Sequence, residues 1–145
     1  MTSTYDRADH FDASEEQRTM PQHADCAFTV ELSDSLPVDW EGGTVVRNRF
    51  AKTFTGELTG AGVVEATMFG TPDGGCAAYI GVERFEGTVG ERKGSFVLLH
   101  SATMAAGTGT QTVAILAGSG TGELAGITGH ADLRPDHTLT LHFDL

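Results

Sequence analysis

The sequence is short of positive charge and of long hydrophobic runs, and each shortage excludes a class of partner. Nine Lys and Arg stand against 20 Asp and Glu in 145 residues, which gives a net charge of -11. Nucleic-acid binding needs basic side chains that neutralise phosphates, so this balance argues against a nucleic-acid partner. It argues equally against docking on an anionic membrane surface. No run of about 18 apolar residues occurs, so no transmembrane helix is expected.

Cysteine is also scarce, and the N-terminus lacks an apolar segment. Cys26 and Cys76 lie far apart in the chain and do not make a disulfide framework. The first residues are acidic and do not resemble a signal peptide. We therefore expect a cytoplasmic protein in which both thiols are reduced and buried as small hydrophobic groups.

Glycine is abundant, but all 19 glycines follow residue 41. Glycine at this density weakens helices and serves turns and bulges. From residue 24 onward apolar residues alternate with polar or small ones, as in the segment that holds Cys26, Phe28, Val30 and Leu32. This period of two predicts a half-buried strand. Seven further strands are expected between glycine-rich turns, over residues 44–56, 63–69, 76–87, 93–104, 110–117, 122–133 and 138–145. A loop with Pro37 is expected after the first strand, and Gly60 and Gly62 are expected to mark a turn before residue 63.

Eight such strands predict an all-β domain over residues 24–145, a mostly antiparallel up-and-down barrel. Closure removes the strand edges that an open sheet would expose. An eight-stranded barrel has room for packed side chains or for one small ligand. Residues 1–23 are expected to form a separate, flexible acidic arm with a short helix over 13–20. That arm is either loosely docked or a lid over the mouth of a pocket.

Two of the predicted strands are apolar on both faces, over residues 95–99 and 112–117. In a simple monomeric barrel the outer face is exposed to solvent and carries polar side chains. We therefore expect the outer face to be covered by the N-terminal arm or by another copy of the chain in a homo-oligomer.

Glu83 is the first candidate for chemistry. It shares a strand face with Tyr79 and Phe85, and if that face lines the bore, the carboxyl group loses water and its pKa rises. Such a group suits general acid or base catalysis. The alternative is a structural ion pair with Arg47 or Arg49 on another strand.

His100 is the second candidate, since it shares an apolar face with Phe96 and Leu98. A lone histidine there is often a core residue. Neighbouring strands of a meander face each other, however, which would bring His100 to Glu83. A carboxylate that orients an imidazole is a recurrent acid–base arrangement.

A third candidate catalytic residue, Glu65, lies on a strand that is apolar on both faces, so its orientation stays open between the pocket and the surface. Small-molecule pockets are mostly apolar with a few polar groups. The expected substrate-binding wall consists of Tyr79, Phe50, Phe54, Phe69 and Thr67. The alternative is that these side chains simply fill the core.

Metal and cofactor motifs are missing. His130, His137 and His142 gather near the C-terminus with Asp132 and Asp136, but no HExxH spacing and no close pair of cysteines is present. No phosphate-binding loop or dinucleotide-binding fingerprint occurs either. We therefore expect neither a metal nor a cofactor.

Two segments, YIGVERFEGTVGERKGSFVLLHSATM (79–104) and GSGTGELAGITGHADL (118–133), resemble a bacterial family of unknown function with an allene-oxide-cyclase-like barrel. The pattern G-T-G-x-L-x-G-x-x-G (120–129) is also similar to that of plant allene oxide cyclases and dirigent proteins. The resemblance covers residues 24–145 and implies an eight-stranded barrel with a pocket in its bore. In that family Glu83 and His100 look like motif positions. Relatives by fold include cofactor-independent cyclases and isomerases, although fold alone does not decide function.

Three functions follow from these expectations. The first is a cofactor-independent cyclase or isomerase that folds an apolar, polyketide-like intermediate inside the barrel, with Glu83, His100 and Glu65 moving protons. The second is a non-catalytic, lipocalin-like carrier of a hydrophobic small molecule. The third is an interaction protein whose bore is simply packed.

Overall fold

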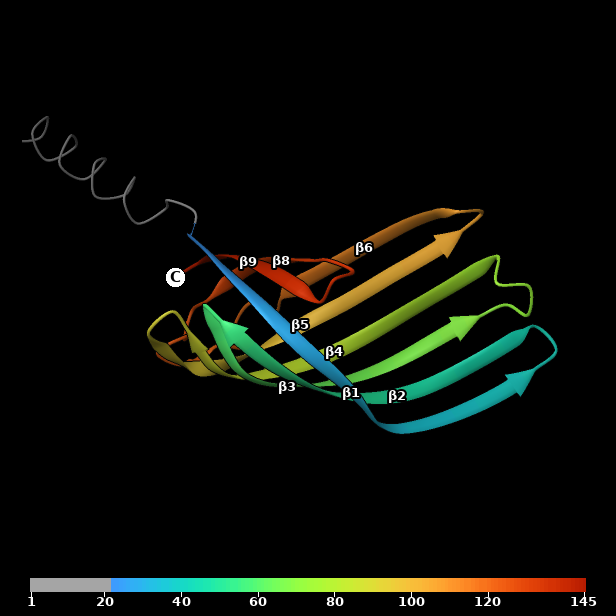
Figure 1. Cartoon of the computed structure of the whole chain (residues 1–145), viewed down its shortest axis with the longest axis horizontal. Helices are drawn as coiled ribbons and strands as arrows, with labels where there is room; N and C mark the ends of the chain where they lie inside the picture. Colours follow the sequence, from blue (N-terminus) through green and yellow to red (C-terminus); the bar gives the residue numbers. More distant parts are fainter. Residues whose placement is uncertain (1–21) are drawn as a thin grey trace, which may run out of the picture.

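The computed structural model describes residues 22–145, so the predicted helix over 13–20 and the choice between arm and lid lie outside the described residues. Nine strands form one antiparallel sheet: β1 (Gln22–Trp40), β2 (Gly43–Gly56), β3 (Leu58–Gly70), β4 (Cys76–Val89), β5 (Arg92–Ala105), β6 (Thr108–Ile115), β7 (Thr121–Gly122), β8 (Thr128–Leu133) and β9 (Thr138–Asp144). Eight of them follow the order β4-β3-β2-β1-β9-β8-β6-β5, and β4 pairs with β5 to close the barrel. The predicted eight-stranded barrel is confirmed (Figure 1).

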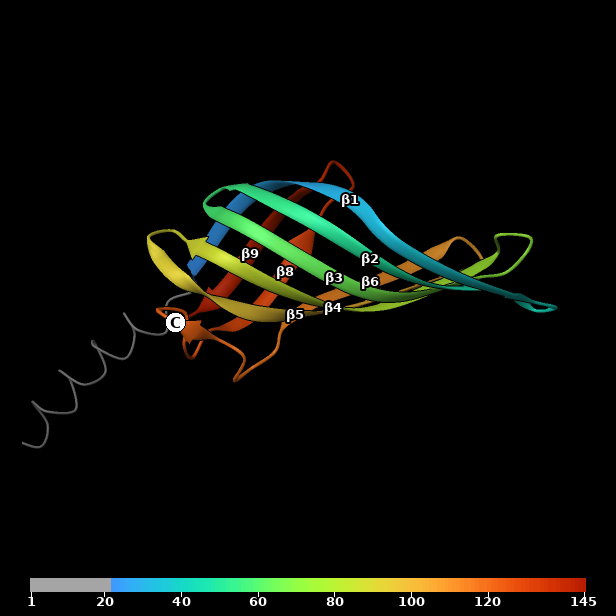
Figure 2. The same cartoon turned by 90° about the horizontal axis from the view of Figure 1, so that it is seen from below.

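β1 is longer than predicted, because it continues through Pro37 to Trp40 where a loop was expected. β9 pairs only with Gln22 to Ala27 of β1, so the distal part of β1 pairs with β2 alone and is an edge strand. Proline has no N–H to donate to a neighbouring strand, and an edge strand tolerates this loss. The hairpins β1–β2, β3–β4 and β5–β6 extend beyond the barrel at this end (Figure 2).

The turn expected at Gly60 and Gly62 is also wrong, since both residues lie inside β3. Gly60 pairs with Gly87 of β4, and a Cβ on either glycine would collide with the backbone of the facing strand. Gly60 also has φ +148, a conformation that side chains rarely adopt. Glycine here permits a close approach of two strands rather than a turn.

The predicted strand over 122–133 divides into β7, a series of turns and β8. Leu124 and Ile127 lie in those turns and are completely buried. They close one end of the barrel, which is filled by the aromatic rings of Phe54, Phe85 and Phe96 and by surrounding aliphatic side chains. One end of the bore is therefore solid core, and only the opposite end has space for a ligand.

The outer surface of β4, β5 and β6 exposes several large apolar side chains, as the two-faced pattern indicated. Ile80, Val82, Leu99 and Leu116 are all exposed. What covers this face, whether another copy of the chain or the arm, stays a prediction. Among the described residues, no helix is long and apolar enough to cross a membrane.

The two cysteines differ in environment. Both are free; Cys26 is buried in the core, whereas Cys76 is exposed at the start of β4. The expectation that both are buried is therefore wrong for Cys76, because β4 begins there in a solvent-exposed hairpin end. Burial raises the pKa of the Cys26 thiol to about 11, with Asp25 adding to the shift. A thiol with so high a pKa is a poor nucleophile, as expected for a structural cysteine.

Candidate functional site

Three strands of the barrel wall each direct one polar side chain inward at the same level. Lys52 comes from β2, Glu83 from β4 and His100 from β5, and each alternates with outward-facing neighbours. β3 lies between β2 and β4, and Gly62 of β3 pairs directly with Lys52. A Cβ on Gly62 would overlap Glu83 Oε2, so the missing side chain lets the lysine and the carboxylate meet across β3.

The three side chains form one hydrogen-bonded cluster. Lys52 Nζ lies 3.1 Å from Glu83 Oε1, and His100 Nε2 lies 2.7 Å from the same oxygen. Glu83 is completely buried, His100 is 3% exposed and Lys52 is 8% exposed. The Lys52 ammonium also lies 4.7 Å from the centroid of the Phe28 ring, a distance typical of a cation–π contact. The cluster is therefore a buried charge network supported by an aromatic face.

The charge state of Glu83 follows from two opposing effects. Burial acts to raise its pKa, but the hydrogen bond from His100 and the charge of Lys52 together outweigh burial and lower the pKa. This corrects the sequence-based expectation of a raised pKa, which considered burial without the cation. Glu83 is thus ionised at neutral pH and accepts hydrogen bonds only.

The charge on Glu83 determines which ring nitrogen of His100 carries the proton. A carboxylate cannot donate, so His100 Nε2 carries a proton and donates it to Glu83 Oε1. In a neutral imidazole the other nitrogen, Nδ1, then holds a free electron pair. No described protein group is hydrogen-bonded to Nδ1. The arrangement therefore presents a base whose tautomer is set by the carboxylate behind it.

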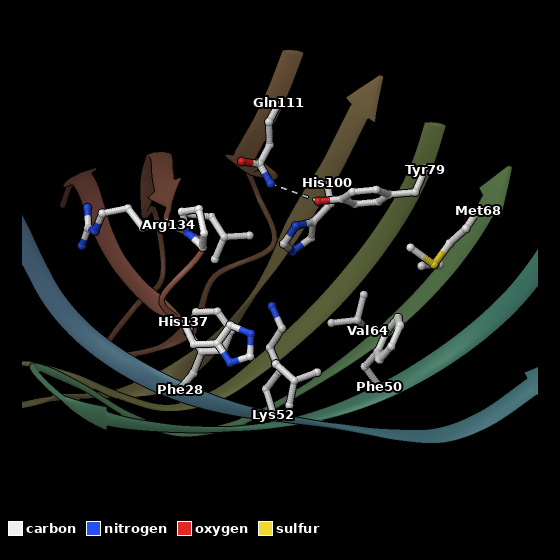
Figure 3. A pocket seen from close by; sticks show the side chains of 14 residues that line it. Phe28, Phe50, Lys52, Val64, Met68, Tyr79, His100, Gln111, Arg134 and His137 are labelled. Carbon is white, nitrogen blue, oxygen red and sulfur yellow. Dashed lines mark hydrogen bonds between the residues drawn. The ribbon is translucent and has the colours of Figure 1, made fainter. Parts of the chain in front are cut away.

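The cluster adjoins a pocket of about 390 Å³ in the open end of the barrel (Figure 3). Lys52 and His100 line this pocket, whereas Glu83 lies behind them and does not. In Figure 3 the Lys52 amine extends toward the imidazole of His100. Most other lining side chains are apolar: Phe28, Val30, Phe50, Val64, Ala66, Met68, Leu133 and Pro135. Such a lining with few polar groups is typical of a site for an apolar small molecule.

The turn between β8 and β9 forms one side of the pocket mouth. Arg134 and His137 line the pocket, and the His137 ring stacks on Phe28 with centroids 5.2 Å apart. The Phe28 amide donates a hydrogen bond to the His137 carbonyl at 2.9 Å, which fixes the turn to β1. On the opposite side Gln111 donates to the Tyr79 hydroxyl at 3.1 Å. Polar groups thus surround the mouth of an otherwise apolar hollow.

Only some of the residues predicted to form a substrate-binding wall line the pocket. Phe50 and Tyr79 line the pocket. Phe54 is packed between Phe28 and Phe85 in the solid end and does not line the pocket. Phe69 contacts the Trp40 ring and lines a neighbouring hollow of about 320 Å³.

Thr67 and Glu65 lie away from the pocket. Both line a separate hollow of about 250 Å³ with Arg47 and Arg49. Glu65 Oε1 accepts from Arg49 Nε at 2.8 Å, and both side chains are about half exposed. The structure therefore brings Glu83 and His100 together but does not bring Glu65 to them.

Lys52 is the main residue that sequence reasoning missed. Its position on the apolar face of residues 44–56 is visible in the sequence, because it occurs between Phe50 and Phe54. An isolated lysine on a buried face requires a buried anion. The predicted partners of Glu83 were instead Arg47 and Arg49, which lie on the other face of the same strand. Arg134, His137, Gln111 and Met68 carry no comparable signal, since only the fold brings them to the pocket.

Comparisons with known proteins agree with this architecture. A family model described as a protein of unknown function, DUF3224, matches residues 24–145. The chain belongs to the DUF3224 family. A DUF3224 protein of unknown function from Shewanella oneidensis MR-1 has a similar crystal structure, with 27% sequence identity and a TM-score of 0.73. The match covers 85% of this chain and 96% of that one.

No curated protein matches this DUF3224 chain. The predicted membership in a bacterial family of unknown function is confirmed, over the predicted range of residues. The finer likeness to allene oxide cyclases and dirigent proteins stays a prediction, since neither the family description nor the solved relative names an activity.

Proposed function

We propose that this DUF3224 protein is a cofactor-independent isomerase or cyclase that acts on an apolar, ketone-containing molecule in the pocket. The observation that carries the proposal is the Lys52–Glu83–His100 cluster beside an apolar hollow of about 390 Å³. A buried charge network costs free energy that an apolar core would not. Glu83 Oε2, moreover, is buried without a hydrogen-bond partner among the described groups. Such costs are common at catalytic sites.

His100 is suited to take a proton from a carbon next to a carbonyl group. Its Nδ1 is the basic nitrogen in the neutral tautomer that Glu83 selects, and the residue lines the pocket. Glu83 would also stabilise the imidazolium that forms, as a carboxylate does behind a catalytic histidine. A positioned base of this kind contributes about 10²–10⁴ in rate.

Lys52 is suited to stabilise the negative charge that develops during such a step. As the C–H bond breaks, its electron pair moves toward the carbonyl oxygen and gives an enolate, which the ammonium group would stabilise. If a C=C bond adjoins that carbon, the enolate is a dienolate, and it takes the proton back from the imidazolium at its far carbon. The double bond moves, and the molecule is isomerised without a change in formula. If the enolate carbon instead attacks a second carbonyl of the same molecule, the new C–C bond closes a ring. The alkoxide formed from that carbonyl then takes the proton from the imidazolium.

The apolar walls would contribute by holding a flexible molecule in a reactive conformation. Phe28, Phe50 and Val64 provide contact surface, and the Tyr79–Gln111 pair offers hydrogen bonds to oxygen atoms near the mouth. This distribution fits a molecule with an apolar body and several oxygens, as in a polyketide-like intermediate.

A test that requires no knowledge of the natural substrate is proton exchange on a model ketone. The protein is incubated with 2-tetralone in D2O, and deuterium uptake beside the carbonyl is followed by mass spectrometry. The unaltered chain should accelerate exchange above the buffer rate. His100→Gln keeps a donor to Glu83 but removes the base, and it should lower the rate by about 10²-fold or more. Lys52→Met should lower it to a similar extent.

Glu65→Gln is the matched control, because it removes a carboxylate from the same barrel wall outside the pocket. It should leave exchange unchanged. The competing function is a carrier, which the apolar lining also favours. Displacement of the dye anilinonaphthalene sulfonate by 2-tetralone, with exchange at the buffer rate in all variants, would establish binding without catalysis. Equal exchange rates in the unaltered chain and His100→Gln would refute the catalytic proposal.

A further inference from the structure

A row of histidines crosses the outer face of the barrel on three neighbouring strands. His23 of β1 pairs with His142 of β9, and His142 pairs with His130 of β8. The adjacent row holds Asp25, Thr140 and Asp132 in the same order. Residues two apart on a strand share a face, and directly paired residues have Cβ atoms about 4.5–5.5 Å apart. Imidazoles and carboxylates therefore gather in one outer patch.

Three of these side chains already converge. The His142 and His130 rings stack with centroids 4.9 Å apart and planes inclined by 21°. His142 Nε2 lies 2.8 Å from Asp132 Oδ2. One ligand atom from each of His130, Asp132 and His142 lies within 4.8 Å of the others. The group combines two imidazole nitrogens with one carboxylate oxygen.

We propose that His130, Asp132 and His142 bind a divalent transition metal of the zinc class. Imidazole suits zinc, copper and nickel, and two histidines with one carboxylate form a known catalytic and binding set. Ligand atoms about 2.1 Å from a tetrahedral zinc ion lie about 3.4 Å from one another. His142 Nε2 and Asp132 Oδ2 are 2.8 Å apart, and no separation in the group exceeds 4.8 Å, so side-chain rotations would complete the site. Water, or His23 from the next strand, would take the fourth position.

The electrostatic surroundings favour a cation. Asp132 is a ligand, and Asp25 lies on the other side of Thr140 in the same row. One opposing charge, the guanidinium of Arg134, donates hydrogen bonds to Thr138 and Thr140 at 2.8 and 3.0 Å. The net charge of the chain is -11, which adds a general attraction for cations.

This site departs from the sequence-based expectation of no metal, which rested on the absence of a known spacing motif. His130 and His142 belong to different strands and meet through the pairing of β8 with β9. Sequence motifs describe ligands at fixed spacing within one segment. They do not detect ligands that the pairing of separate strands brings together. The proposed metal site lies on the outer face of the barrel, so it does not depend on the function proposed for the pocket.

Zinc titration by isothermal calorimetry tests the site, with the full chain, a metal-free preparation and a non-chelating buffer. The unaltered protein should bind one zinc ion per chain. His142→Gln or His130→Gln should weaken binding by at least about tenfold, since even outer-shell changes cost that much. Asp132→Asn should weaken it as well, and His23→Gln should weaken it less.

A second readout is thermal unfolding with and without zinc. A ligand that binds only the folded state raises the melting temperature, so zinc should stabilise the unaltered chain but not His142→Gln. His10→Gln and Glu65→Gln are matched controls, which remove a histidine outside the described residues and an exposed carboxylate on β3; both should bind zinc normally. Equal zinc affinity in the unaltered chain and a His130→Gln/His142→Gln double variant, or no saturable binding in the unaltered chain, would overturn the proposal.

Discussion

Two ion pairs in the same barrel wall have similar geometry and opposite surroundings. Lys52 and Glu83 meet inside the barrel with N and O atoms 3.1 Å apart, whereas Arg49 and Glu65 meet outside at 2.8 Å. The inner side chains are 7% and 0% exposed, and the outer ones are 52% and 51% exposed. Both cations belong to β2, so the difference arises from which face of the strand each residue occupies.

The comparison shows that distance alone does not rank these pairs. The outer pair has the shorter distance, but water and salt screen its charges, and such pairs are worth about 0–1 kcal/mol. The inner pair sits where screening is weak, so loss of one member leaves a buried charge without compensation. We therefore expect the inner pair to dominate the response of this protein to mutation and pH, and to be the place where chemistry is available.

The largest effect is expected from Glu83→Gln. The substitution keeps the shape of the side chain but leaves the Lys52 ammonium buried without a counter-ion, and such changes cost about 3–5 kcal/mol. The free energy of unfolding from urea denaturation measures the loss. Glu65→Gln removes the same chemical group from the outer pair and should cost less than about 1 kcal/mol. A similar loss in both variants would contradict the comparison.

A smaller loss is expected from Gly62→Ala, which adds a methyl group beside Glu83 Oε2 and 3.0 Å from the Phe54 ring. Overpacking of this kind costs about 1–3 kcal/mol and would separate Lys52 from Glu83. Gly70→Ala on the same strand is the control, since nothing lies within 4 Å of its added Cβ. Urea denaturation should find the first variant destabilised and the second unchanged. If both behave alike, Gly62 does not make room for the inner pair.

The pH dependence separates the inner pair from the outer one. The pKa of Glu83 is lower in the folded protein than its ordinary value of 4.5, so its ionised form stabilises the fold. That contribution is complete above the unfolded pKa and is lost as the pH falls through the folded pKa. The stability difference between the unaltered chain and Glu83→Gln should therefore shrink below about pH 4.5, by at most about 1.4 kcal/mol per pH unit.

Urea denaturation between pH 7 and pH 3 measures this difference, with Glu65→Gln as the reference. The Arg49–Glu65 pair is half exposed and worth about 0–1 kcal/mol, which bounds the difference for Glu65→Gln. A gap between the unaltered chain and Glu83→Gln that stays constant down to pH 3 would show that Glu83 does not titrate with a lowered pKa.

The barrel and two of the three residues of the Lys52–Glu83–His100 cluster could be predicted from the sequence. Alternation places Glu83 on one face with Tyr79 and Phe85, and His100 with Phe96 and Leu98, and meander pairing then brings the two together. These inferences succeed because strand period and adjacent pairing are local rules. The predicted lengths of β1 and β3 were wrong. Proline on an edge strand and glycine where two strands approach closely both resemble turn signals in a sequence.

The cation of the site could not be predicted as reliably. Lys52 reaches Glu83 from β2 across the intervening β3, so their meeting depends on Gly62 rather than on adjacent pairing. Periodicity likewise left Glu65 undecided, because its strand is apolar on both faces. Arg134 and His137 reach the pocket through the turn between β8 and β9, whose path depends on its anchorage to Phe28. Contacts that depend on an intervening strand or on the path of a turn are not encoded in local spacing.

The smallest effect should come from the outer pair itself, measured as a coupling energy. A double-mutant cycle with Arg49→Ala and Glu65→Ala isolates the interaction from the separate effects of each substitution. We expect a coupling of about 0.2–1 kcal/mol that falls as salt is added, because the two side chains are half exposed and screened. The corresponding cycle with Lys52→Met and Glu83→Gln should give a larger coupling that salt changes little. If the outer coupling equals the inner one at high salt, burial is not what distinguishes the two pairs.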